Sequence, residues 1–121
     1  MGLYPHILFV ENDDIKHMIV KLNLARLGVE VVRAVSLTDA QEKLDGQDFD
    51  LIIMDGEVPG DVSETVAFVR LLLARRPEQI ILANSRGHNH KLLDAGCLEE
   101  LVLPNPTLQI KRLLRIPDAT G

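Results

Sequence analysis

The sequence contains little cysteine, few aromatic residues and no excess of positive charge. Cys97 is the only cysteine among 121 residues, so neither an intrachain disulfide nor a cysteine-based metal cage can form. One tyrosine, three phenylalanines and no tryptophan provide little surface for stacking single-stranded nucleic acid. The formal net charge of −5 argues against the clustered basic face that phosphate contacts need. We therefore expect an aliphatic core and no nucleic-acid binding by this domain.

Long apolar runs are also missing. No stretch reaches the roughly 18 apolar residues that cross a bilayer, and the first residues lack the pattern of a signal peptide. We therefore expect a cytoplasmic protein with no membrane association. The apolar fraction of 46% and the length suit one globular domain. We assign residues 1–116 to this domain and 117–121 to a C-terminal tail or the start of a linker.

Short apolar runs of β type alternate with helical patterns along the chain. The predicted strands are residues 6–10, 30–34, 51–54, 80–83 and 101–103. The predicted helices run from 15 to Gly28, from the Ser36 cap to Gly46, from the Asp61 cap through Leu73, over 87–95, and from an Asn105 cap with Pro106 as first residue. The first helix carries an apolar stripe of Ile15, Met18, Ile19, Leu22 and Ala25.

Five β/α pairs of this length predict an α/β fold of the flavodoxin-like (βα)5 type, a three-layer sandwich. Residues 51–54 are apolar on both faces, as in a central parallel strand covered by helices on both sides. The strand order 2-1-3-4-5 is taken from known folds of this type. Ligand chemistry is expected outside the carboxyl ends of the strands.

Acidic residues fall at that edge of the predicted sheet. Glu11 follows the first strand, Asp55 ends the third, and Glu57 lies two residues beyond. Because adjacent parallel strands lie about 5 Å apart, these carboxylates can converge on one hard cation such as Mg²⁺. A carboxylate at such a site can also attack phosphorus and form an aspartyl phosphate. Asp13, Asp14 and Asp61 are expected only to cap helices or to remain solvated in loops.

Four ordered segments resemble the motifs of response-regulator receiver domains, and the resemblance covers residues 6–115. The segments are Val10–Asp13, Asp48–Asp55 with Pro59, Ile80–Arg86, and Ala95–Pro104. The resemblance implies two-component (phosphorelay) signal transduction by a domain that is not an enzyme. It also implies that Glu11 is a metal-binding acid, that Asp55 is the phosphoacceptor, and that Glu57 offers its backbone carbonyl to Mg²⁺. The implied partner is a histidine kinase or another signalling protein.

Other positions depart from the receiver pattern. Asn12 replaces the second acid, which leaves a weak Mg²⁺ site, and Asn84 replaces the usual hydroxyl residue, with Ser85 beside it. Leu103 replaces a lysine whose charge-assisted contact to phosphate contributes roughly 1.5–3 kcal/mol. Glu100 replaces an aromatic switch residue.

Two local features could compensate for these losses. The Glu57 side chain could restore the missing acid, and Arg86 could supply a cation, although a solvated position is the preferred interpretation for Arg86. Cys97 is expected to be a small buried filler. His88 and His90 are not expected to bind metal, because residues two apart point in different directions on a helix.

We therefore keep two hypotheses. The first is an atypical receiver, or pseudo-receiver, that acts mainly as a protein-interaction module with a degenerate phosphorylation site. The second is a receiver that accepts phosphoryl on Asp55 from a histidine kinase with Mg²⁺. A flavin-binding flavodoxin is disfavoured because the acidic residues 11–14 would repel a phosphate, so no organic cofactor is expected. By analogy with receivers, the fourth helix, fifth strand and fifth helix would bind a partner or form a homodimer.

Overall fold

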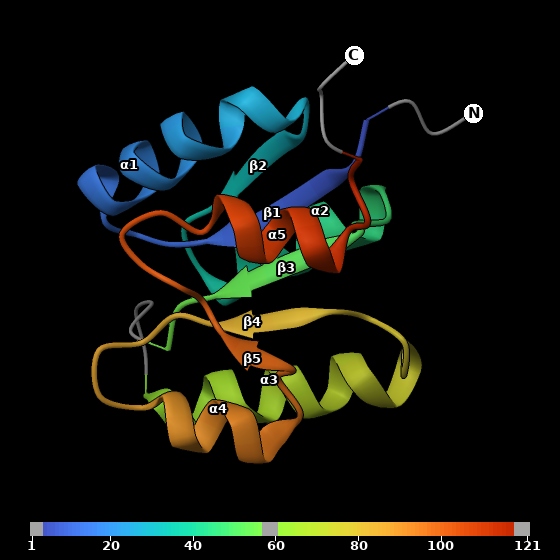
Figure 1. Ribbon diagram of the computed structural model, residues 1–121. Helices are drawn as coiled ribbons and strands as arrows, with labels where there is room; N and C mark the ends of the chain where they lie inside the picture. Colours follow the sequence, from blue (N-terminus) through green and yellow to red (C-terminus); the bar gives the residue numbers. More distant parts are fainter. Residues whose placement is uncertain (1–3, 57–60, 118–121) are drawn as a thin grey trace.

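The computed structural model describes residues 4–56 and 61–117. Figure 1 shows a central sheet with helices on both faces. The strands are β1 (His6–Val10), β2 (Glu30–Ala34), β3 (Leu51–Met54), β4 (Ile81–Ala83) and β5 (Glu99–Glu100). The helices are α1 (Asp14–Leu24), a short 3₁₀ helix (Ala25–Leu27), α2 (Leu37–Gly46), α3 (Val62–Arg75), α4 (Asn89–Ala95) and α5 (Thr107–Leu113).

The described strands form one parallel sheet in the order β2-β1-β3-β4-β5, so the predicted flavodoxin-like fold is confirmed. Successive strand residues point to opposite faces and build two cores. One core packs Phe9, Ile53 and Leu82 under α1 and α5. The other packs Leu8 and Ile52 with residues of α2, α3 and α4. All of β3 is buried, as expected of a central strand.

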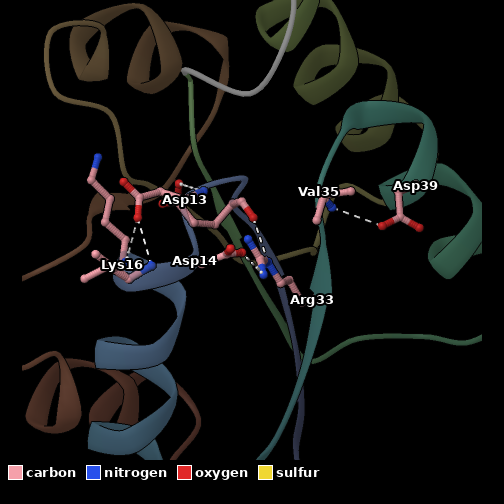
Figure 2. Close-up of polar contacts among 8 residues, drawn as sticks. Asp13, Asp14, Lys16, Arg33, Val35 and Asp39 are labelled. Atoms are coloured by element: carbon pink, nitrogen blue, oxygen red, sulfur yellow. Dashed lines mark hydrogen bonds and ion pairs between the residues drawn. The ribbon is translucent and has the colours of Figure 1, made fainter.

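Side chains at the predicted caps begin several helices. The Asp13 carboxylate accepts the backbone N–H groups of Ile15 (2.9 Å) and Lys16 (3.1 Å) at the start of α1. Ser36 Oγ accepts the N–H of Asp39 (3.0 Å), whose carboxylate accepts the N–H of Val35 (3.0 Å; Figure 2). The hydrogen bonds of these side chains satisfy donors that the first helical turn leaves unpaired, which explains why these helices begin where the sequence predicts.

Helix α1 presents apolar residues on two opposite faces. Val20 and Leu24 pack on the sheet and are 2% and 0% exposed. The stripe that predicted the helix points away from the sheet. Its large members are Ile15 (69% exposed), Met18 (58%), Ile19 (47%) and Leu22 (67%). The helix prediction is confirmed, but the hydrophobic periodicity alone did not identify the buried face.

The predicted fifth strand, residues 101–103, is wrong, because β5 consists of Glu99–Glu100. The Leu101 N–H still donates to the carbonyl of Ala83 (2.8 Å). The next N–H, of Val102, points to the open side of this edge strand and donates to the side chain of Gln109 on α5 (2.7 Å). This contact attaches the chain after Leu101 to α5.

Other boundaries in the C-terminal half shift by one or two residues. Helix α4 begins at Asn89 rather than 87, and β4 begins at Ile81 rather than 80. Helix α5 begins at Thr107 rather than Pro106, although the Asn105 side chain accepts the Thr107 N–H (3.0 Å) as a cap would.

Cys97 is buried in the core beneath α4, as predicted, and burial raises the pKa of its thiol to about 12. The thiol is therefore protonated at neutral pH and acts as a small packing group. Within the described parts of the chain, no helix combines the length and the apolar character that crossing a membrane requires.

We predict that Gly96→Ala destabilises the fold by about 1–3 kcal/mol. Gly96 has φ +122°, and a Cβ there would lie 2.4 Å from Leu73 Cδ1. The matched control is Gly46→Ala, where a Cβ would meet nothing within 4 Å. Urea unfolding measures both free energies. Equal stability of the two variants would contradict the prediction.

Candidate functional site

The parallel ladder brings three predicted site residues together at the carboxyl edge of the sheet. The Asp55 N–H donates to the carbonyl of Val10 (3.1 Å), and the Asn84 N–H donates to the carbonyl of Met54 (2.9 Å). These bonds place Glu11, Asp55 and Asn84 directly after three neighbouring strands. The Asn84 side-chain amide then donates to Glu11 Oε1 at 3.4 Å. The sequence prediction that acids converge at this edge is confirmed for Glu11 and Asp55.

Glu11 and Asp55 form a buried carboxyl pair, and each residue is 1% exposed. Burial raises the pKa of Glu11 to about 8, and a hydrogen bond to Asp55 and repulsion from its charge act in the same direction. The Asp13 N–H, which donates to Glu11 Oε2 (3.2 Å), and the positive charge of Lys16 oppose this rise in pKa. Glu11 therefore largely keeps its proton at neutral pH.

The donor set of this pair suits one hard divalent cation. Mg²⁺ is often held by one or two carboxylates, with water and phosphoryl oxygens completing its octahedron. Binding a cation would also remove the repulsion that raises the Glu11 pKa. Across residues 4–56 and 61–117, no group of three or more His, Cys, Asp or Glu side chains is arranged to hold a metal ion. Asn12 is exposed, and Glu57 lies outside the described residues.

Leu103 borders an open groove of about 290 Å³ beside the acid pair. Its side chain is 55% exposed, so the residue at the expected lysine position presents a hydrocarbon surface. Lys16 and the exposed Arg86 also border the groove. The remaining lining residues are Ile19, Val20, Asn84, Ser85 and Pro104. The structure therefore brings the predicted switch positions Asn84, Ser85 and Leu103 together around one groove.

Glu100, the fourth predicted switch position, lies apart from this groove and is linked to it by hydrogen bonds. Its carboxylate accepts the side-chain amide of Asn89 (2.6 Å), and Asn89 Oδ1 accepts the Ser85 N–H (2.8 Å). Ser85 in turn packs on the backbone after Asp55, because a Cβ at Gly56 would lie 3.0 Å from Ser85 Oγ. Sequence reasoning missed Asn89, since no local pattern indicates a contact to Glu100.

Arg33 is a second residue that sequence reasoning missed. Its Nε donates to the backbone carbonyl of Glu11 (3.0 Å), and its Nη1 pairs with Asp14 Oδ1 at 2.6 Å (Figure 2). The side chain therefore ties the segment that carries Glu11 to the start of α1. The strand register could have indicated this contact. Arg33 lies opposite Phe9 on β1, and Phe9 is two residues before Glu11.

We predict that Glu11→Gln makes stability less dependent on pH. The raised pKa means that the folded protein keeps a proton which the unfolded chain releases near pH 4.5. The stabilisation from this proton is complete below pH 4.5 and is lost as the pH rises toward about 8. Relative to the parent chain, Glu11→Gln should therefore gain roughly 1–3 kcal/mol between about pH 5 and pH 8.

Urea unfolding at several pH values measures this difference. Glu42→Gln on the exposed side of α2 is the matched control and should follow the parent curve. A Glu11→Gln curve parallel to that of the parent chain would show that the buried carboxyl pair does not hold the proton.

Comparison with known proteins agrees with the fold. No protein-family model matches the chain. Protein PetR of Rhodobacter capsulatus is 30% identical over 115 residues, which cover 93% of this chain and 47% of PetR. The chain thus spans about half the length of that curated relative.

Solved structures of response regulators superpose on nearly the whole chain. A response regulator from Thermotoga maritima has a TM-score of 0.79 at 19% identity and covers 93% of this chain and 99% of its own. The chemotaxis response regulator CheY4 of Vibrio cholerae has a TM-score of 0.73 at 25% identity, with 94% and 99% covered. An orphan response regulator of H. pylori has a TM-score of 0.74 at 16% identity, with 92% and 97% covered. In its sheet order and its overall architecture, the chain has the fold of the response-regulator receiver domains of the CheY-like type.

Proposed function

We propose that this receiver domain acts in two-component signalling mainly as a protein-interaction module whose phosphorylation site is degenerate. The observation that carries the proposal is the half-exposed Leu103 in the groove beside Asn84. A leucine there offers a phosphoryl group no charge-assisted contact, and such a contact is what would make the β5–α5 loop respond to phosphate.

The contacts of the other replaced positions support the proposal. The Asn84 amide is bonded to Glu11, and Glu100 is bonded to Asn89 on α4. Asn84 has no hydroxyl group that could turn toward a phosphoryl oxygen. Glu100 has no aromatic ring that could change its burial. At both positions, the residue that would transmit phosphorylation in a typical receiver is therefore replaced by one held in a polar contact.

The buried acid pair supports the second hypothesis, a phosphorylatable receiver. In that reaction an Asp55 carboxylate oxygen attacks the phosphorus of a kinase phosphohistidine. An O–P bond forms, the N–P bond breaks, and the imidazole leaves with its electron pair. Mg²⁺ would be held weakly by Glu11 and Asp55, and Lys16 and Arg86 border the groove that the phosphoryl group would approach. No organic cofactor takes part in this hypothesis.

The surface formed by α4, β5 and α5 is the proposed contact with a histidine kinase, another signalling protein or a second copy. Side chains fix these elements to one another. Arg112 Nη2 lies 2.7 Å from Glu99 Oε1, and Gln109 Nε2 donates to Glu99 Oε1 (2.9 Å) and to the Glu100 carbonyl (2.7 Å). A surface held in this way keeps its shape without phosphorylation, as a constitutive interaction module requires.

We predict that Mg²⁺ with beryllofluoride, a phosphoryl mimic, produces no amide chemical-shift changes beyond the immediate neighbours of Glu11 and Asp55. Leu103 and Asn84 provide no contact that would carry the change toward β5. The measurement is an amide NMR titration with Mg²⁺ alone, and then with Mg²⁺ and beryllofluoride.

The control is Asp55→Asn, which removes the group that would bind beryllofluoride. Shifts in the parent chain at Leu103 and on the α4–β5–α5 surface, absent from Asp55→Asn, would contradict the interaction-module proposal. The absence of any shift at about millimolar Mg²⁺ would contradict the phosphoacceptor hypothesis.

A further inference from the structure

The outward face of α1 is an apolar stripe that nothing in the described structure covers. It consists of Ile15, Met18, Ile19 and Leu22, which are 69%, 58%, 47% and 67% exposed. Residues spaced three and four apart lie on one side of a helix, so these side chains form one continuous surface about two turns long. The helix needs none of them for its own packing, because Val20 and Leu24 bury the opposite face against the sheet.

Apolar residues are also exposed on and beside the surface formed by α4, β5 and α5, but they are spread over separate segments and do not line one helix face. Leu98, Val102, Leu103 and Leu108 are 55%, 53%, 55% and 80% exposed, and the ordered contacts there are made by Glu99, Gln109 and Arg112. Single exposed apolar residues are normal, whereas a contiguous patch of a few hundred Å² marks an interaction site. Of the two surfaces, α1 is therefore the one that favours apolar association.

We propose that a second copy of this chain covers the stripe, with the two α1 helices packed antiparallel about a two-fold axis. An isologous interface requires that the same patch be complementary to itself. The stripe meets this requirement when the axis passes between Met18 and Ile19. Met18 of one copy then packs on Ile19 of the other, and Ile15 packs on Leu22.

The charges beside the stripe are complementary in the same arrangement. Asp14 and Lys21 lie seven residues apart, close to two helical turns, so they occupy the same flank of the stripe. The two-fold axis brings Asp14 of each copy toward Lys21 of the other. Asp14 pairs with Arg33, but its side chain remains 85% exposed and accessible to a second cation. On the other flank, Lys16 meets the neutral Asn23, whose side-chain amide donates to the Pro104 carbonyl (3.0 Å).

The size of the stripe predicts a weak, reversible dimer. A patch of a few hundred Å² on each copy lies at the lower end of specific interfaces. We therefore expect a dissociation constant of roughly 10–100 µM. Self-association through α1 goes beyond the proposed function, which places its partner contacts on α4, β5 and α5.

Sedimentation equilibrium from about 1 µM to 1 mM tests the proposal with the full chain. The parent chain should dimerise, and Met18→Glu should weaken the dimer at least about tenfold, because two carboxylates would meet beside the axis. Leu71→Glu is the matched control, since Leu71 is 62% exposed on α3 across the sheet and its replacement should leave the dimer intact. Circular dichroism checks that each variant is folded.

A charge exchange tests the antiparallel arrangement. Asp14→Lys and Lys21→Glu should each weaken the dimer, and the double variant should restore it, because each lysine again meets a glutamate of the other copy. A monomer at all concentrations would overturn the proposal, even if α1 bound a helical signalling partner. A dimer broken by Val102→Glu but not by Met18→Glu would also overturn it and would favour the α4–β5–α5 surface.

Discussion

The parallel pairing of β3 with β1 places two carboxyl groups against each other where water does not reach them. The Asp55 N–H is bonded to the Val10 carbonyl, so Asp55 must lie beside Glu11. Burying two carboxyl groups together is costly unless a proton, a cation or hydrogen-bond donors offset the charge. The structure supplies a proton on Glu11, whose pKa rises to about 8, together with the Asp13 N–H and the Asn84 amide. Both donors come from residues that follow the sheet strands β1 and β4.

The replaced residues change how this edge of the sheet can respond to a ligand. Asn84 donates to Glu11 and so stabilises the acid pair, whereas Leu103 leaves the groove beside it partly apolar. Glu100 is bonded through Asn89 to the Ser85 N–H, a contact between fixed polar groups. Under the proposed function, the site retains the groups that would bind a cation or a phosphoryl group and lacks those that would transmit the binding. This combination suits a domain whose partner recognition is independent of phosphate.

The parts of the fold that depend on local patterns could be predicted from the sequence. The strand alternation and the caps at Asp13 and Ser36 use only neighbouring residues, and so does the position of Asp55 after an apolar strand. The features that the sequence did not predict depend on residues far apart in the chain. The chain after Leu101 is held by Gln109 of α5, and Arg33 on β2 reaches the Glu11 carbonyl just beyond the neighbouring strand β1. On α1 both faces are apolar, so periodicity gives the helix but not the face that packs on the sheet.

The same interactions connect the acid pair to α1. Arg33 binds the Glu11 carbonyl with Nε and Asp14 with Nη1, and Asp13 both caps α1 and donates its N–H to Glu11. Lys16 on α1 favours the ionised form of Glu11. A change in the charge of the acid pair therefore acts directly on the first turn of α1, whereas an effect on β5 would have to pass through the switch positions. If α1 also forms the dimer, Asp14 takes part in both contacts. Thermodynamic linkage is then reciprocal. A ligand that favours ionised Glu11 changes the dimerisation constant by the same factor by which dimerisation changes the affinity for that ligand.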